Sequence, residues 1–376
     1  MSSRYSGKKT ILLLIPTLAP HDAMGRDLLM GGKILEDAGF TVKIYAEHLG
    51  KGLRPPGLIT LDAAKQMVTD ENYLVFYHMG VYWHLLMDFA RRAKGPFVIK
   101  YHNMTPPRYF ADYDHGSFVA TNHGLKQVRE LFRFRKVDGL IGASAFNLDD
   151  IIKVTGKQSI TDLAKVCDVQ APFTDIHQTT LQKANPRVEA ILSQSKFNVL
   201  FVGRLVPNKG HHHLMATMKS YEQLYSKDFQ LILCGSLSPA FQKYMTELRE
   251  LATRGAIADK VQFIHDASDE DLSALYRGSQ AFLCMSEHEG FCVPVIEAQS
   301  AGLPVVAWNQ AAVGGTTGKG GIVLNNLDYD VFATALHQLR SDAGLRGQMV
   351  AAGQDNARNF GQGVLGQKLI DFMGRF

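Results

Sequence analysis

Two glutamates, Glu289 and Glu297, could bring carboxylates to the start of one helix. They are separated by seven residues, and Gly290 and Pro294 lie between them. Gly290 permits a tight turn, and proline is tolerated in the first turn of a helix. We therefore expect Glu289 on a loop and Glu297 in the first turns of a helix whose free N–H groups suit a phosphate. The carboxylates could accept hydrogen bonds from sugar hydroxyls, although taken alone they equally suit a capped surface helix with solvated glutamates.

The segment 201–210 offers two cations on a loop between a strand and a helix. Its sequence is FVGRLVPNKG, in which a predicted strand ends at Gly203 and is followed by Arg204 and Lys209. A guanidinium binds a pyrophosphate as a bidentate fork, and an ammonium binds it as a point charge. By itself the loop could equally carry two solvated cations. Because the acidic segment lies in the same half of the chain, a phosphate-binding role is favoured.

Both segments belong to an alternation of short strands and helices, which indicates right-handed βαβ units and a parallel sheet. In the first half we expect strands at 10–15, 41–46, 73–77, 96–101 and 139–143, and helices at 26–38, 81–93 and 123–136. A linker is predicted at 167–196. The pattern then restarts with strands at 197–202, 229–234, 261–265, 281–285, 304–307 and 321–323, and helices at 212–224, 239–253, 270–277 and 293–301.

The fold class is therefore predicted to be α/β, with two doubly wound Rossmann-like domains facing across a cleft. The chain has 376 residues, and single cores stop growing at ~250–300. We expect one domain at 1–190, a second domain at 191–360, and a helix in 361–376. Ligands of such sheets bind outside the carboxyl ends of the strands, so the cleft is the expected site.

Composition excludes several classes of protein. The chain is 46% hydrophobic and 20% charged with a net charge of +4, which argues against disorder and gives no support to a nucleic-acid binder. The first 190 residues are mildly basic and the rest are near neutral. No apolar run approaches the ~20 residues of a membrane-spanning helix, and the first apolar run is too short for a signal peptide. Four cysteines without metal or disulfide spacing favour the cytoplasm.

Two common nucleotide sites are disfavoured. The turn after the first strand, PTLAPHDAMGRD, has no GxGxxG, and no GxxxxGK[ST] occurs in the chain. A Rossmann dehydrogenase and a P-loop enzyme are therefore poor interpretations.

Residues 197–307 resemble the carboxyl-terminal domain of retaining GT-B glycosyltransferases of family GT4, the glycosyl transferases group 1. The family has an E-x7-E signature, here Glu289 to Glu297 in EGFCVPVIE, and a G-R-x-x-x-x-K-G motif, here Gly203, Arg204, Lys209 and Gly210. The stretches DEDLSALYRGSQAFLCMSEHEGF and AGLPVVA resemble segments of that family and occur in the same order. The resemblance extends more loosely over the amino-terminal half, where LEDAGFTVKIYA is compatible.

The resemblance implies an acceptor-binding domain at 1–190, a donor-binding domain at 191–360, and a helix in 361–376 that packs back on the first domain. It also implies a role for each matching residue. Arg204 and Lys209 would bind the pyrophosphate of a nucleotide-sugar donor, Glu297 the ribose hydroxyls, and Glu289 the hydroxyls of the donor sugar. The other expected donor-binding positions are Gly25, Gly203, Gly235, Gly290, Phe291, Cys292 and Val293. This chain reads GFCVP where most relatives read GFGLP, a tolerated change if only backbone N–H groups act there.

In the first domain, His102 ends a predicted strand in VIKYHNMTPP, where the family places a histidine close to the donor sugar and acceptor. Gly25 follows Met24 in the place of the family's glycine-rich first loop, which often has two glycines. Nearby polar or aromatic residues that could contact the acceptor are Asn103, Thr105, His78 and Trp83, the last of which equally suits a core. We expect His102, Glu289, Arg204 and Lys209 to take part in catalysis.

The resemblance also implies a mechanism. A glycosidase pair with carboxyls ~5 Å apart is disfavoured, because both glutamates would contact donor hydroxyls. We expect a front-face displacement in which a leaving phosphate oxygen helps to take the acceptor's proton. No metal and no cofactor are expected, since Arg204 and Lys209 can replace a metal. The triplet His211–His213 is interpreted as the plain start of a helix, because adjacent residues cannot all face one ion from a helix.

The basic helix expected at 123–136 interleaves cations with apolar residues and could contact anionic lipid, although a packed helix with a solvated basic face is the plainer interpretation. We predict a retaining hexosyltransferase that uses a nucleotide-diphosphate sugar and a saccharide or lipid-linked acceptor. It would act in polysaccharide or glycolipid synthesis, in the cytoplasm or at the inner face of the membrane. The alternatives are a nucleotide-sugar epimerase on the same scaffold, a non-catalytic sugar-nucleotide sensor, and a phosphorylase-like enzyme.

Overall fold

The structure is a computed structural model that describes residues 10–19, 22–174, 185–265 and 267–376. The chain forms two compact units. The first comprises Met1–Pro107, Val119–Thr174 and Gly361–Phe376, and the second comprises Arg108–Phe118 and Asp175–Phe360. Each unit contains one six-stranded sheet whose strand pairs are all parallel, so the α/β fold class is confirmed.

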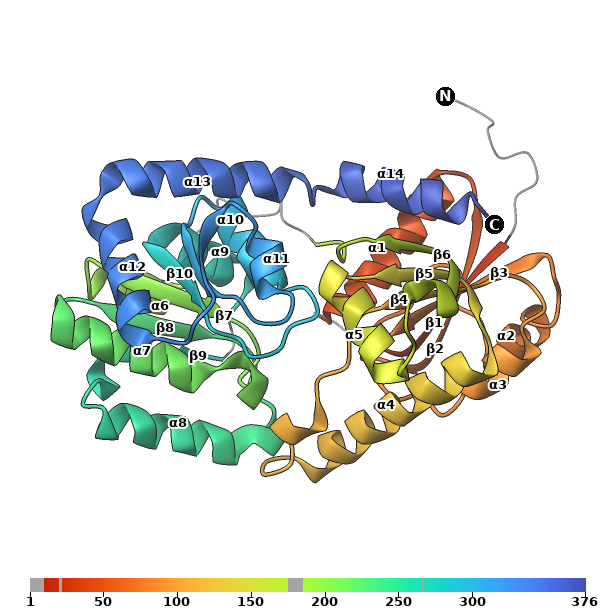
Figure 1. The fold of residues 1–376 in the computed structure, drawn as a ribbon, viewed down its shortest axis with the longest axis horizontal. Coiled ribbons are helices and arrows are strands. Elements are labelled where there is room, and N and C mark those ends of the chain that lie inside the picture. The colour runs from red at the N-terminus through yellow and green to blue at the C-terminus, as the bar shows by residue number, and fades with distance from the viewer. Residues whose placement is uncertain (1–9, 20–21, 175–184, 266) are drawn as a thin grey trace. The chain divides into compact units, whose positions relative to one another are not determined.

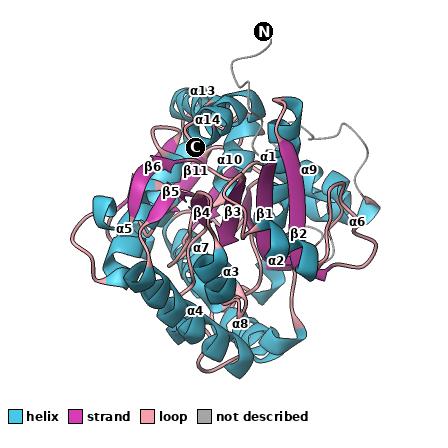
Figure 2. Cartoon of the chain, turned by 90° about the vertical axis from the view of Figure 1, so that its right-hand side faces the viewer, coloured by secondary structure: helices cyan, strands magenta, loops and turns pink. Residues whose placement is uncertain are grey.

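The first unit has the strand order β2-β1-β3-β4-β5-β6. Its strands are β1 (Thr10–Leu18), β2 (Thr41–Leu49), β3 (Tyr73–Met79), β4 (Phe97–Tyr101), β5 (Val137–Gly142) and β6 (Ala164–Val169). Its helices are α1 (Ala23–Asp37), α2 (Leu61–Met67), α3 (Leu86–Arg92), α4 (His115–Phe134), α5 (Ala145–Thr155) and α14 (Gln362–Met373). Figure 2 shows these strands in magenta with helices in cyan around them. The order reverses between β1 and β3, which is the switch point of this sheet.

The second unit has the strand order β12-β11-β10-β7-β8-β9. Its strands are β7 (Asn198–Val202), β8 (Gln230–Cys234), β9 (Val261–Ile264), β10 (Ala281–Cys284), β11 (Val305–Trp308) and β12 (Gly321–Leu324). Its helices are α6 (Pro186–Ser193), α7 (His211–Leu224), α8 (Gln242–Arg254), α9 (Asp269–Gly278), α10 (Val293–Ser300), α11 (Val313–Thr317), α12 (Tyr329–Ser341) and α13 (Ala343–Arg358) (Figure 1). This is the dinucleotide-fold order, and its switch point lies between β7 and β10.

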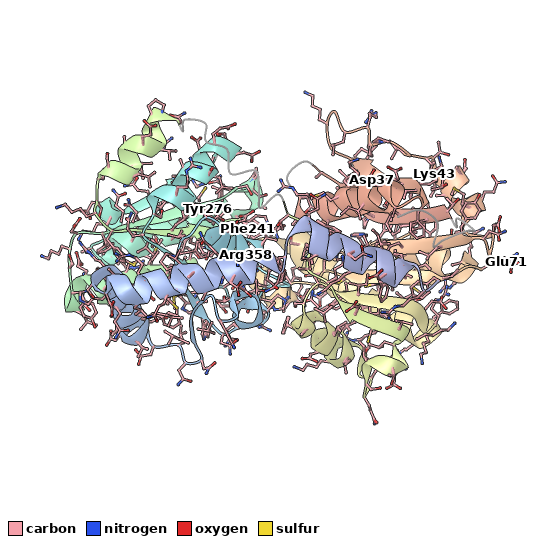
Figure 3. All side chains as sticks on the ribbon, turned by 90° about the horizontal axis from the view of Figure 1, so that it is seen from above. Asp37, Lys43, Glu71, Phe241, Tyr276 and Arg358 are labelled. Carbon is pink, nitrogen blue, oxygen red and sulfur yellow. The ribbon has the colours of Figure 1, made fainter. Side chains whose placement is uncertain are left out.

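Local sequence explains the main helix boundaries. The Asp22 carboxylate caps α1 by accepting a hydrogen bond of 2.9 Å from the Gly25 N–H. The chain leaves that helix through Gly39 at a φ of 95°, a conformation that glycine adopts without strain. Ser268 and Asp271 form a capping box at the start of α9. Figure 3 shows Asp37, the last residue of α1, and Lys43 of β2 among the side chains of the first unit.

The predicted linker at 167–196 is wrong over its described ends. Its first residues belong to β6, an edge strand whose residues alternate between more and less exposed positions, so no apolar run marks it. Its last residues contain α6, where Asn185 caps the helix and Pro186 occupies the first turn. Pro186, which favours a break in regular structure when taken from the sequence alone, therefore begins a helix. Residues 175–184 lie outside the described residues.

The helix expected at 81–93 is shorter than predicted, because α3 begins only at Leu86. The preceding turn is fixed by Gln127 of α4, whose side-chain oxygen accepts from the Trp83 N–H at 3.0 Å and whose amide donates to the Trp83 carbonyl at 2.6 Å. A side chain from another element thus replaces helical hydrogen bonds here, which the local sequence could not indicate.

Two segments belong to a different unit from the residues that adjoin them in the sequence. Helix α14 packs within the first unit, where Gln170 donates to the Leu365 carbonyl at 2.9 Å. Residues 108–118 belong to the second unit, where the Tyr113 hydroxyl donates to Glu247 at 2.7 Å. Within the described residues, no helix combines the length and the apolar character that crossing a bilayer requires.

Candidate functional site

The two motif segments of the second unit follow neighbouring strands. Residues 203–210 follow β7, residues 285–292 follow β10, and these two strands pair directly. Because the strand order reverses between them, their carboxyl ends flank the place where ligands of doubly wound sheets bind. The sequence motifs therefore meet at the switch point.

Lys209 and Glu289 are in direct contact at this switch point. Their Nζ and Oε1 atoms lie 2.6 Å apart, and their side chains are 15% and 11% exposed. Arg204 is exposed on the same loop, and its guanidinium makes no ion pair or hydrogen bond with the residues that the structure describes. The loop thus presents one cation that is already paired and one that is available to an anion.

Close backbone packing explains two of the glycines. A Cβ on Gly235 would lie 1.9 Å from the carbonyl oxygen of Gly203, so the ends of β7 and β8 can approach only without side chains. Gly210 has a φ of 67°, and a Cβ there would lie 2.1 Å from the Met285 carbonyl oxygen. Gly210 and Gly235 are therefore positions that require glycine. The close approach also brings Gly203 and Gly235 together, both of which were expected among the donor-binding positions.

Asn208 ties the two loops together, and the sequence analysis missed it. Its carbonyl accepts from the N–H groups of Glu287 and His288 at 2.9 and 3.3 Å, and its side-chain amide donates to the His288 carbonyl at 3.0 Å. The residue is 4% exposed. An asparagine between the arginine and lysine of a loop motif was the available signal, and its buried amide positions Lys209 beside Glu289.

Helix α10 begins at an unusual backbone position. Cys292, its N-cap residue, has φ 80° and ψ 65°, and no side chain caps the helix. The Thr316 hydroxyl donates to the Phe291 carbonyl, and Gly290 and Val293 flank this turn. Since the first N–H groups of a helix lack intrahelical partners, Cys292 and Val293 can offer N–H groups to an anion. Pro294 has no N–H, and the Val295 N–H donates to the Cys292 carbonyl at 3.1 Å.

Glu297 lies one turn into α10 and is oriented by a buried tyrosine. The Tyr276 hydroxyl of α9 donates to Oε2 of Glu297 at 2.7 Å. Burial and the neighbouring Glu297 carboxylate raise the pKa of Tyr276 well above its usual range, so the hydroxyl remains a donor. Figure 3 labels Tyr276 inside the second unit. Sequence reasoning found Glu297 and missed Tyr276.

His102 of the first unit is part of a buried polar cluster. Its Nε2 lies 3.1 Å from Nδ1 of His78 and 3.5 Å from Oδ2 of Asp27. The Lys100 ammonium donates to Oδ1 of the same aspartate at 2.8 Å. Burial lowers the pKa of His102 to about 4, although the Asp27 carboxylate opposes that effect. His102 is therefore a neutral imidazole at pH 7, which can accept or donate a hydrogen bond.

The other first-unit candidates differ in environment. Gly25 lies in the first turn of α1, where a Cβ would come within 3.0 Å of the Leu18 side chain. The Asn103 amide donates to Asp150 at 3.0 Å. Trp83 is 2% exposed, and its indole donates to Glu47 at 2.9 Å, so it belongs to the core and does not line an acceptor groove.

A hollow of about 410 Å³ lies beside α4 in the first unit. Its lining is polar and aromatic and comprises Tyr82, His84, Met87, His123, Lys126, Gln127 and Glu130. The sequence analysis did not identify this hollow.

The histidine triplet is divided among three environments. His211 is fully buried and lies 3.2 Å from the Tyr244 hydroxyl, and burial lowers its pKa to about 3. His212 and His213 each place Nε2 near Oε1 of Glu287, at 3.7 and 3.6 Å. The three imidazoles therefore do not converge on one ion, although His212 and His213 both approach the Glu287 carboxylate.

The predicted donor residues thus gather at one switch point of the second unit. Lys209 contacts Glu289, Gly203 abuts Gly235, and residues 290–293 with Glu297 form the start of α10. Gly25 and His102 belong to the other unit.

The family match falls within the second unit. Residues 183–356 match the family described as glycosyl transferases group 1. A D-inositol 3-phosphate glycosyltransferase of Salinispora tropica is 32% identical over 221 residues, which are 57% of this chain and 44% of the relative. The O-antigen chain mannosyltransferase B of Escherichia coli is 28% identical over 162 residues, 43% of this chain and 41% of the relative. Each match therefore spans less than half of the relative's length.

Solved structures match the whole chain. Anabaena HepE in complex with UDP and glucose has a TM-score of 0.74 at 18% identity, covering 98% of this chain and 100% of that one. A sucrose-phosphate synthase of Thermosynechococcus elongatus has a TM-score of 0.72 at 16% identity, covering 98% and 99%. Two doubly wound units and these neighbours establish the GT-B fold, and residues 183–356 match the glycosyl transferases group 1.

Proposed function

We propose that this chain is a retaining glycosyltransferase of family GT4. It transfers a hexosyl group from a nucleotide-diphosphate sugar to a hydroxyl of a saccharide or lipid-linked saccharide. The observation that carries the proposal is the contact between Lys209 and Glu289 across the β7–β10 switch point. A cation for a diphosphate and a carboxylate for sugar hydroxyls meet where a doubly wound sheet binds its ligand.

Each donor group has a matching partner. The diphosphate would lie against Arg204, Lys209 and the N–H groups at the start of α10, because these groups are the positive ends of the site. Glu297, fixed by Tyr276, would accept hydrogen bonds from the ribose hydroxyls, and Glu289 would accept them from the transferred sugar. The structural neighbour solved with UDP and with UDP-glucose supports a nucleotide-sugar donor.

In the transfer step, the acceptor oxygen forms a bond to the anomeric carbon while the bond from that carbon to the diphosphate breaks. The acceptor's proton passes to the leaving phosphate oxygen on the same face, which gives retention. The charge that develops on the diphosphate is stabilised by Lys209 and Arg204, so positioning and electrostatics supply most of the catalysis. The neutral His102 imidazole would hydrogen-bond the sugar or acceptor, and no metal is needed for the leaving group.

A lipid-linked acceptor would be met at the inner face of a membrane, with the enzyme in the cytoplasm. The cations Lys126, Arg129, Arg133 and Lys136 are exposed on and just after α4. Of the interleaved apolar residues, Val128, Leu131 and Phe132 are buried in the first unit's core, whereas Phe134 at the end of α4 is exposed. Contact with lipid would therefore be mainly electrostatic, with Phe134 as an apolar contribution. Flotation with anionic liposomes but not with neutral ones would support this contact.

The function is tested by donor screening followed by product analysis. UDP-, GDP- and ADP-sugars are tested for thermal stabilisation, because a ligand that binds only the folded state raises Tm. The stabilising donor is then incubated with candidate acceptors, and the anomeric configuration of the product is read by NMR. Retained configuration in a new glycoside supports the proposal. An epimer formed from donor without acceptor supports the nucleotide-sugar epimerase, and an inverted product contradicts the retaining mechanism.

A further inference from the structure

Three potential ligand atoms converge in the first unit at the switch point of its sheet. They are Oδ2 of Asp27 on α1, Nδ1 of His78 in β3, and Nε2 of His102 just after β4. The three side chains are 0%, 2% and 10% exposed. We propose that Asp27, His78 and His102 form a binding site for one divalent transition-metal ion of the Zn²⁺ or Co²⁺ class.

The spacing of the three atoms matches one face of a tetrahedral site. The distances are 3.1 Å between the two histidine nitrogens, 3.4 Å from His78 to Asp27, and 3.5 Å from His102 to Asp27. For metal–ligand bonds of ~2.0–2.1 Å, the edge of a tetrahedron is about 3.3–3.4 Å. An ion could therefore reach all three atoms with only small adjustments of the side chains.

The pairing of Asp27 leaves one carboxylate oxygen for the ion. Oδ1 accepts from the Lys100 ammonium at 2.8 Å and from the Phe173 N–H at 2.7 Å. Oδ2 is buried and has no hydrogen-bond donor within the described part of the chain. A buried carboxylate oxygen without a donor carries a large desolvation cost, which coordination to a cation would offset.

The donor set consists of two imidazole nitrogens and one carboxylate oxygen. Two nitrogens and one oxygen favour Zn²⁺ and Co²⁺ over Mg²⁺, which prefers oxygen ligands. Three protein ligands leave the fourth tetrahedral position to water or another ligand, as in catalytic zinc sites.

The Lys100 ammonium limits the affinity of the proposed site for a divalent cation. Its ammonium balances Asp27, so a dication enters a cluster whose protein charges already cancel. Replacing Lys100 with methionine removes the competing charge and keeps an apolar stem of similar length. We therefore expect Lys100→Met to bind Zn²⁺ more tightly than the unmodified chain, by at least about tenfold.

The test measures metal binding on the full chain after chelation, independently of any transferase assay. Zn²⁺ is titrated by calorimetry and by the shift of Tm, and Co²⁺ by the visible absorption that a tetrahedral site produces. We expect one ion per chain, a rise of several degrees in Tm, and loss of both in Asp27→Asn and His78→Gln. Because Asp27→Asn leaves Lys100 unpaired and could unfold the unit, Asp27→Asn/Lys100→Met is measured as well.

The matched control removes the other histidine cluster. The His212→Gln/His213→Gln variant abolishes the histidine pair beside Glu287 and should keep the first-unit site. Loss of binding in that control, unchanged binding in the Asp27 and His78 variants, or no binding at all would overturn the proposal. The transfer-deficient Lys209→Ala variant should still bind Zn²⁺, so the failure of the metal site and the failure of the proposed function give different results.

Discussion

Nζ of Lys209 lies 2.6 Å from Oε1 of Glu289 across the switch point between β7 and β10. The two residues are eighty positions apart in the sequence, and the buried Asn208 amide fixes the loops that carry them. Each of these largely buried charges is compensated by the other. A donor that enters must share this pair, taking the ammonium on its phosphate and the carboxylate on its sugar.

Replacing Lys209 with alanine should abolish turnover while the fold persists. Loss of a group that stabilises charge in the transition state costs about 10²–10³-fold in kcat, and here the uncompensated Glu289 would also repel the diphosphate. Initial rates and circular dichroism check this. Lys219→Ala is the matched control, because Lys219 pairs with Glu222 on the surface of α7 at 2.8 Å. Near-normal activity in Lys209→Ala would refute the diphosphate assignment.

Transfer should continue in EDTA. Arg204 and Lys209 supply the positive charge that a metal would otherwise bring to the leaving group. Chelation also empties the proposed site at Asp27, His78 and His102, so retained activity means that turnover needs neither ion. Activity that is lost in EDTA and restored by Mg²⁺ or Mn²⁺ would contradict the metal-free leaving group. Restoration by Zn²⁺ alone would instead make the first-unit site essential.

Tyr276→Phe should raise the donor KM and also lower the free energy of unfolding. The substitution keeps the buried ring and removes the hydrogen bond to Glu297, which weakens the orientation of that carboxylate toward the ribose. A hydrogen bond to a charged group contributes about 1.5–3 kcal/mol to stability, and the expected rise of roughly tenfold in the donor KM corresponds to about 1.4 kcal/mol of binding free energy. Tyr221→Phe serves as the control, since its hydroxyl pairs with Arg340. Equal donor KM values in the two variants would contradict the proposed binding of the ribose by Glu297.

Much of the fold was predictable because its strands are short apolar runs between amphipathic helices. Strand β1, predicted at 10–15, and helix α7, predicted at 212–224, agree with the structure to within a few residues. The failures have a common cause. Edge strand β6 shows no apolar run, and the turn before α3 depends on Gln127 from a distant helix. Hydrophobic periodicity marks a regular face that is apolar and fully buried. Most inward positions of β6 are only partly buried, and the turn before α3 has no regular face.

The candidate site was predictable where chemistry and motif coincide, as at Lys209, Glu289 and Glu297. The supporting residues Asn208, Tyr276 and Asp27 were not. Their side chains are buried polar groups whose partners lie 80, 21 and 73 positions away. Only the packing of different elements creates these pairs, so no local pattern could reveal them.

Cys292 should tolerate glycine but not valine. Its φ of 80° costs a residue with a Cβ about 1–2 kcal/mol, which glycine avoids. Glycine also forfeits the buried thiol contact to Cys284, whose Sγ is 3.7 Å away, so the two effects nearly cancel. A β-branched valine keeps the strain and crowds the turn. Urea unfolding should place Cys292→Gly within about 1 kcal/mol of the parent and Cys292→Val well below it. Equal stability of the two variants would show that the turn relaxes.

The second unit should lose stability in acid through His211. Burial lowers its folded-state pKa to about 3, against about 6.5 when unfolded. The unfolded state therefore binds the proton first. The stability that His211 contributes is complete above pH 6.5 and is lost as the pH falls toward 3, by at most about 1.4 kcal/mol per pH unit. His211→Gln can keep a hydrogen bond to Tyr244 without titrating, so its unfolding free energy should decline less between pH 6.5 and 4.5. The exposed His48→Gln variant should follow the parent, and parallel curves for all three chains would exclude His211 as a source of acid sensitivity.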